Sequence, residues 1–191
     1  MIRRRRSSPA GVGVLSPRRK WRAITVATLV LVPSYWSVLA GLVSVASDDP
    51  DAPPAGPFIA FGLALIPFVF IVLAFLSEHP RAPGAAVKGM GLALVVGIPV
   101  SAIAADAVTG LVAAVGAGGI AALRADREEA WKARAIAVLA VSAYVYLMIR
   151  LAGDVTLLLA PTLPFTCLGV ADHLAERRRE RTEERQAAES T

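Results

Sequence analysis

Long apolar runs separated by short charged segments constrain this chain more than any other feature. The runs cover residues 22–46, 57–77, 88–105, 107–123, 135–151 and 154–172. A helix needs about 20 mainly apolar residues to cross roughly 30 Å of hydrocarbon, and a slightly shorter one crosses where the bilayer thins. Six such runs take up most of the 191 residues. The pattern predicts an all-α, polytopic membrane helix bundle, with six transmembrane helices arranged as three hairpins.

The distribution of basic residues predicts the orientation of these helices. Nineteen of the twenty Lys and Arg residues fall in segments that six spans place on one side, and only Arg150 falls on the other. Because Lys and Arg concentrate in cytoplasmic loops, we expect a plasma-membrane protein with both its N-terminus and its C-terminus in the cytoplasm. Fusing 88–123 into one helix would divide the charges almost evenly and give a length of about 54 Å. Ala105-Asp106-Ala107 is therefore predicted to be a tight outer turn.

The two ends of the chain are expected to lie outside the membrane. Residues 1–21 are predicted to be a basic disordered cytoplasmic tail, 22–172 the membrane domain, and 173–191 a charged cytoplasmic helical tail. A secretory signal peptide at the N-terminus is the alternative, but its apolar core of about 24 residues exceeds the usual 7–15. The basic tail should attract anionic lipid headgroups, and no nucleic acid is expected, because no aromatic side chains are interleaved with the charges.

Small residues recur at every fourth position in the fourth apolar run, at Gly110, Ala114 and Gly118. In lipid, a face of small side chains lets helix backbones approach closely and replaces the hydrophobic drive for association. We expect this face to be a helix-packing surface within one subunit. A homodimer interface is the alternative that the sequence leaves open.

Prolines fall near the middles of several runs and suggest a cavity at the midplane. Each removes a backbone hydrogen bond, and a membrane tolerates the freed carbonyl only beside protein or a water-filled cavity. The segment 160–166 is the best candidate for a locally broken helix, and transporters place substrates at such breaks. The residues predicted to line this cavity are Pro33, Pro67, Pro99, Ser101, Pro161, Thr162, Pro164 and Thr166.

Charged residues are absent from the centres of all six runs. Those nearest the predicted outer face are Asp106, Arg150 and Asp154. A charge inside hydrocarbon is costly and is usually retained for ion or proton transport, so its absence weighs against an ion carrier. An ion pair between Arg150 and one of the two aspartates is expected to tie the outer ends of the hairpins together.

No arrangement of residues in the sequence predicts catalysis. The single cysteine, Cys167, lies within an apolar run, and His79 and His173 have no second ligand at metal-binding spacing. No serine has a histidine and a carboxylate at the same depth. We expect no enzyme activity, no cofactor and no metal ion.

The segment from Lys88 to Arg124, which begins Lys-Gly-Met-Gly-Leu-Ala-Leu-Val-Val-Gly-Ile-Pro-Val-Ser, together with the Ala, Val, Gly and Arg richness of the chain, is similar to small multi-pass membrane proteins of high-GC actinobacteria. The resemblance implies a bacterial source. It implies no activity and no site residues, because those proteins are uncharacterised.

Small size, short outer turns and the lack of buried charge favour a non-enzymatic accessory or scaffold subunit of a plasma-membrane complex. Its expected partners are the lipid bilayer and a membrane protein or a second copy of the chain. The alternative is a small carrier or channel for a neutral or apolar solute, with its site near the proline-kinked midplane.

Overall fold

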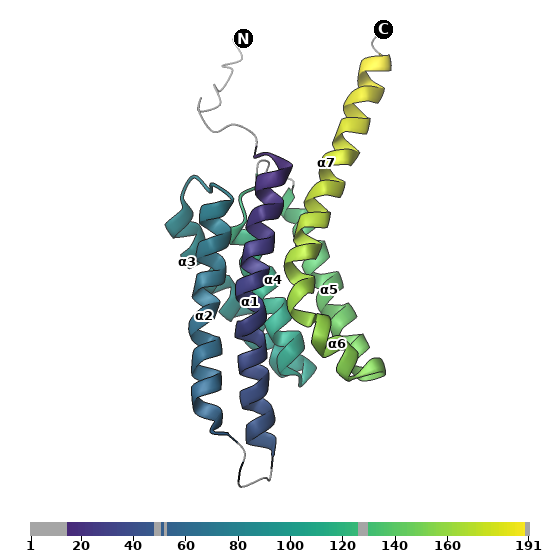
Figure 1. The fold of residues 1–191 in the computed structure, drawn as a ribbon. Helices are drawn as coiled ribbons and strands as arrows, with labels where there is room; N and C mark the ends of the chain where they lie inside the picture. The colour runs from purple at the N-terminus through teal and green to yellow at the C-terminus, as the bar shows by residue number, and fades with distance from the viewer. Residues whose placement is uncertain (1–14, 48–50, 52, 126–129, 190–191) are drawn as a thin grey trace.

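The computed structural model is all-helical over the residues that the structure describes, which are 15–47, 51, 53–125 and 130–189; no strand occurs in these ranges. The predicted N-terminal tail falls mostly outside them, as does part of the loop 47–56. The helices pack side by side in one bundle (Figure 1). They are α1 (Pro17–Ala46), α2 (Ala55–Leu76), α3 (Ala82–Ala104), α4 (Ala107–Ala122), α5 (Ala130–Ala152), α6 (Asp154–Leu159), the 3₁₀ helix η1 (Ala160–Thr162) and α7 (Leu163–Glu189).

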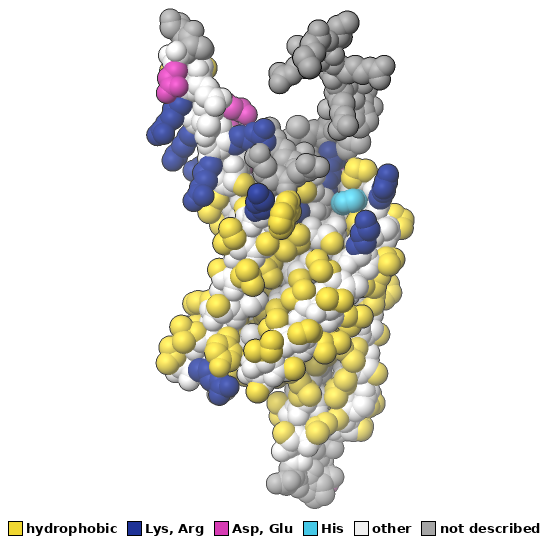
Figure 2. Space-filling view, turned by 180° about the vertical axis from the view of Figure 1, so that it is seen from behind, with side chains coloured by type: hydrophobic (Ala, Val, Ile, Leu, Met, Phe, Trp, Pro, Cys, Tyr) yellow, Lys and Arg dark blue, Asp and Glu magenta, His cyan; other side chains and the backbone are white. Residues whose placement is uncertain are grey.

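Within the described residues, five helical segments are long and apolar enough to cross a membrane, namely α1, α2, α3, α5 and the segment that contains α7. Helix α4 is apolar but has only 16 residues. Large apolar side chains cover the outside of the bundle, as Figure 2 shows; Leu29, Phe61 and Ile103 are 65%, 56% and 86% exposed. Apolar surface of this extent marks contact with a membrane or a partner. Together with the long apolar helices, it is the surface of a membrane-embedded protein.

The first residue of α1 and the last residue of α7 lie at the same end of the bundle, which we call the terminal end (Figure 1). Most of the Lys and Arg side chains visible in Figure 2 gather there. We call the opposite end the distal end; α5 finishes there with Arg150 in its last turn. Helix α1 begins at Pro17, before the predicted start of the first span, so part of the predicted basic tail is helical.

The chain between Asp154 and Glu189 is broken by the 3₁₀ turn η1, and α6 runs at an angle to α7 (Figure 1). Pro161 occupies the first turn of η1, and Pro164 lies in the first turn of α7. A proline there costs little because the first N–H groups of a helix have no intrahelical acceptor. The break therefore occurs within 160–166, the segment that the sequence predicts to be a locally broken helix.

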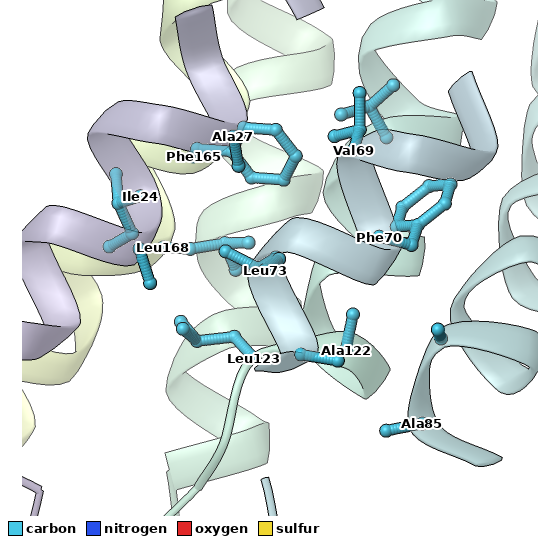
Figure 3. Close-up of a cluster of buried hydrophobic side chains, with 14 of the residues drawn as sticks. Ile24, Ala27, Val69, Phe70, Leu73, Ala85, Ala122, Leu123, Phe165 and Leu168 are labelled. Atoms are coloured by element: carbon cyan, nitrogen blue, oxygen red, sulfur yellow. The ribbon is translucent and has the colours of Figure 1, made fainter. Parts of the chain in front are cut away.

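The largest core cluster lies in the half of the bundle near the terminal end. Figure 3 shows Phe165 and Leu168 of α7 between Ile24 of α1 and Leu73 of α2, with Leu123 at the end of α4 below them. All five side chains are fully or almost fully buried. Side chains from four helices thus meet in one cluster, which positions α7 against the other helices just where it leaves the bundle.

Candidate functional site

Arg134 and Asp172 form a buried ion pair between α5 and α7 near the terminal end. Arg134 Nε donates to Asp172 Oδ1 at 2.7 Å, and Arg134 Nη2 donates to Oδ2 at 2.6 Å. The two side chains are 1% and 3% exposed. Two parallel bonds from one guanidinium to one carboxylate make the strongest and most directional kind of salt bridge. The pair therefore sets the relative depth and rotation of α5 and α7.

The same guanidinium caps the end of α4. Arg134 Nη1 donates to the carbonyl of Leu123 at 2.8 Å, and Nη2 donates to the carbonyl of Arg124 at 2.9 Å. These two residues directly follow Ala122, the last residue of α4, so the cation lies at the negative end of the helix dipole and stabilises it. Ser77, after the end of α2, accepts the N–H of Arg124 on its Oγ at 3.1 Å. Three polar side chains, Ser77, Arg134 and Asp172, thus connect α2, α4, α5 and α7.

Lys20 adds α1 to this arrangement. Its Nζ lies 3.2 Å from Oδ2 of Asp172, and its side chain is 13% exposed. We call Lys20, Arg134 and Asp172 the terminal ion cluster. Both carboxylate oxygens accept from a cation, and the Arg134 and Asp172 side chains are buried. The cluster is built as a clamp between helices, with two positive charges held by one negative charge.

His79 lies in the turn between α2 and α3, also at the terminal end. Its Nδ1 accepts the N–H of Arg81 at 3.1 Å, which requires an unprotonated Nδ1. Burial, followed by the positive charges of Arg124, Lys88 and Arg134, lowers the pKa of His79 from its ordinary value of 6.5. No group of three His, Cys, Asp or Glu that could hold a metal ion occurs in the described ranges.

A groove of about 260 Å³ lies between α1, α2, α3 and α4 in the distal half of the bundle. We call it the distal groove; apolar side chains such as Leu39, Leu63 and Ile98 line it, together with Tyr35 and Ser101. Tyr35 is 2% exposed. Its hydroxyl has no hydrogen-bond partner among the described residues, although buried polar groups are nearly always paired. The groove thus has an apolar lining, and one of its lining residues, Tyr35, carries a buried and unpaired hydroxyl.

The structure places the residues predicted to line a midplane cavity in several different surroundings within the described part of the chain. Ser101 lines the distal groove, whereas Pro161 and Pro164 line a separate space between α1, α4 and η1 that has no room for a water molecule. Oγ1 of Thr162 and Oγ1 of Thr166 donate to carbonyls of the preceding turn of their own segment.

The three other prolines of the predicted cavity lie inside long helices. Pro33, Pro67 and Pro99 occur within α1, α2 and α3, and none of these helices ends at its proline. None of the three side chains lines the distal groove. Near Pro33, Ser34 Oγ donates to the carbonyl of Gly62 on α2 at 2.6 Å, so a polar group is used to join α1 to α2.

The three residues of the predicted outer ion pair lie at or near the distal end. The Asp106 carboxylate caps α4, because it accepts the N–H of Val108 at 3.2 Å and that of Thr109 at 2.7 Å. The Arg150 guanidinium lies 5.4 Å from the centre of the Tyr146 ring, a cation–π contact. Arg150 and Asp106 are not paired in the part of the chain that the structure describes. The side chain of Asp154 lies outside that part, so its pairing with Arg150 stays a prediction.

The small residues of α4 lie against α3 of the same chain. A Cβ at Gly118 would come within 2.6 Å of the carbonyl oxygen of Gly89, and a Cβ at Gly110 would come within 2.4 Å of an α3 side chain. A Cβ at Gly97 of α3 would lie 2.5 Å from the Cβ of Ala114. Any larger side chain at these contacts would force the two helices apart. All three predicted packing residues thus face α3.

Sequence reasoning missed the terminal ion cluster. Arg134 and Asp172 stand near the ends of the fifth and sixth apolar runs that the six-span topology places on one side of the membrane. Their equal depth and opposite charge are a usable signal. That signal does not distinguish Arg134 from Lys132, which has the same charge and almost the same depth.

Comparisons of the chain with protein-family models, with curated proteins and with solved structures find no match.

Proposed function

We propose that this protein is a non-enzymatic accessory subunit of a plasma-membrane complex, and that the end of α7 beyond the bundle binds its partner. The observation that carries the proposal is the exposure of this segment. Every side chain from Glu176 to Glu189 is exposed, and α7 projects well past the start of α1 (Figure 1). We call residues 176–189 the arm.

The composition of the arm supports a binding role. A helix that is polar on all sides has no apolar stripe to bury, so it bridges to another molecule or depends on charge pairs along its own length. One ion pair within the arm joins Arg179 to Glu183. Arg181 and Arg185 form no pair among the described residues. A partner with carboxylates at matching spacing would complement them.

The proposed topology has six spans in three hairpins, with both termini in the cytoplasm. Its support is the accumulation of Lys and Arg at the terminal end, which agrees with the concentration of these residues in cytoplasmic loops. In this topology α4 is the shortest span, about 24 Å at 1.5 Å per residue, and requires local thinning of the bilayer. The arm then lies in the cytoplasm, where a soluble domain of a partner can reach it.

The test is purification of the full chain from its native membrane in mild detergent, followed by native mass spectrometry. We expect a partner in fixed stoichiometry that is lost at high salt, because exposed charge contacts are screened. Arg181→Gln with Arg185→Gln should release it. Arg18→Gln with Arg22→Gln, which removes the same charge from exposed positions on α1, should not. A protein that always purifies alone would refute the accessory role.

The distal groove favours a second function, the binding of a neutral or apolar solute as in a small carrier. The unpaired hydroxyl of Tyr35 beside an apolar lining suits a molecule with one polar group. In this case the purified protein would retain a small molecule, and Tyr35→Phe would lower its occupancy. Equal retention by the wild type and by Tyr35→Phe would contradict a role for the hydroxyl.

A further inference from the structure

A long surface groove runs between α5 and α7, two helices that lie side by side in Figure 1. Its volume is about 840 Å³, within the range of pockets that hold whole organic ligands. Large apolar side chains such as Ile136, Val170 and Leu174 line it, together with small residues such as Ala137 and Ala140. We call it the α5–α7 groove. It lies on a different side of the chain from the distal groove, with which it shares no lining residue.

Two cations line the groove toward the terminal end. They are Lys132, in the first turn of α5, and Arg178, on the part of α7 that leaves the bundle. Both side chains are exposed. Neither is paired with a carboxylate in the described ranges, in contrast to Arg134, which lies two residues from Lys132 and is neutralised by Asp172. The groove is therefore apolar along its length and positively charged at one end.

The dimensions of the groove match one leaflet of a bilayer. Along α5 its lining extends from Lys132 to Tyr144, about 18 Å at 1.5 Å per residue, compared with roughly 15 Å for half of the hydrocarbon core. Trp131, beside Lys132, is exposed, and an exposed tryptophan at a helix end typically lies at the level of the headgroups. The charged end of the groove thus lies at the headgroup layer, and its apolar part lies at the depth of the acyl chains.

We propose that the α5–α7 groove binds one anionic phospholipid from the leaflet at the terminal end. The phosphate lies between the ammonium group of Lys132 and the guanidinium group of Arg178, and an acyl chain follows the alanines that line the groove toward Tyr144. Basic pockets between membrane helices bind anionic headgroups in this way. The inference rests on the membrane embedding of the chain and does not depend on the binding of a partner by the arm.

A second copy of the chain fits the groove less well. In a two-fold symmetric dimer of parallel subunits, the same surface of each copy faces the other. Lys132 and Arg178 of both copies would then meet at one depth, with four positive charges and no carboxylate of the groove between them. Like charges placed together oppose association. An anionic headgroup removes this repulsion, so charge complementarity favours the lipid.

The proposal can be tested with nanodiscs that contain equal amounts of phosphatidylglycerol and phosphatidylcholine with identical acyl chains. Native mass spectrometry of the released full-length protein measures the ratio of the two lipids retained. We expect one phosphatidylglycerol per chain. Lys132→Gln with Arg178→Gln should lower the ratio about 25-fold, since one basic residue near an anionic surface changes affinity about fivefold. The matched control, Arg81→Gln with Lys88→Gln, removes the same charge from exposed positions outside the groove and should leave the ratio unchanged.

A pair of alanine variants tests the apolar part of the groove without changing charge. Ala140 lines the groove, whereas Ala143 is exposed on the same helix outside it. Ala140→Phe should lower phosphatidylglycerol retention, and Ala143→Phe should not; neither site is in the core, so both variants should fold. Equal retention of the two lipids by the wild type would overturn the proposal. So would a lipid-free dimer that Ala140→Phe converts to a monomer, because the groove would then be an interface between copies.

Discussion

Replacement of Arg134 by methionine tests whether the terminal ion cluster holds the helices together. The substitution keeps a long side chain but removes all N–H donors. Asp172, 3% exposed, would retain only Lys20 at 3.2 Å, and the carbonyls of Leu123 and Arg124 would lose their donors. Removal of one partner from a buried ion pair costs about 3–5 kcal/mol where the other charge is left uncompensated, and here Lys20 still lies beside the Asp172 carboxylate. We therefore expect Arg134→Met to lower the free energy of unfolding by up to this amount.

A double-mutant cycle separates the pairing energy from the loss of packing. Asp172→Leu alone should also be strongly destabilising, because it leaves the guanidinium of Arg134 buried without a counter-charge. The double variant Arg134→Met with Asp172→Leu should lose less than the sum of the two, since apolar replacement of both partners is often nearly neutral. A coupling energy of about 1–3 kcal/mol is expected for contacting residues.

The measurement is reversible unfolding in mixed micelles by added dodecyl sulfate, followed by far-ultraviolet circular dichroism. The matched control is Arg19→Met, which breaks the ion pair of Arg19 with Glu78 between side chains that are 61% and 50% exposed. An exposed pair contributes only about 0–1 kcal/mol. If Arg134→Met destabilises no more than Arg19→Met does, the cluster is not the clamp that its geometry indicates.

Three further predictions use the same unfolding measurement. Gly118→Ala should lower the free energy of unfolding by about 1–3 kcal/mol, because the new Cβ would lie 2.3 Å from the Phe70 ring. Gly91→Ala, whose new Cβ would meet no atom within 4 Å, should leave that free energy unchanged or raise it. Equal effects of the two substitutions would contradict close packing of α4. The folded-state pKa of His79 is lowered, so the unfolded state binds more protons below the ordinary value of 6.5. Stability should therefore decline as pH falls through that value, and less so in His79→Gln; an identical pH dependence in both proteins would contradict the assignment. Asp106→Ala should lower the free energy of unfolding by about 1 kcal/mol, the usual contribution of an N-cap, while Asp106→Asn should retain most of that stability. Equal losses in the two variants would exclude capping by Asp106.

The helical architecture could be predicted because it follows from local composition. In lipid, a run of about 20 apolar residues can form all its backbone hydrogen bonds within itself only as a helix. The break at η1 is local too, since Pro161 and Pro164 act on their own turns. Helix ends were less predictable, as in α1, which begins at Pro17 inside a segment expected to be disordered.

The candidate sites were less predictable, because each depends on contacts between distant parts of the chain. Ser101 and Tyr35 meet at the distal groove from α3 and α1, while Thr162 and Thr166, equally polar in sequence, bond to their own helical segment. A cavity cannot be inferred from polar residues at equal depth, because the rotation of each helix decides which of them face one another.

What the sequence alone determined is the long apolar helices and the segregation of basic charge, since both are properties of short segments read one after another. The tertiary structure decided which basic side chain is paired with a carboxylate and which is not. Arg134 and Lys132 are two residues apart on α5, so they project in different directions from the helix. The packing of α7 against α5 places Asp172 beside Arg134 and leaves Lys132 at the edge of a groove. That choice depends on helix rotation and depth, which only the packed bundle determines.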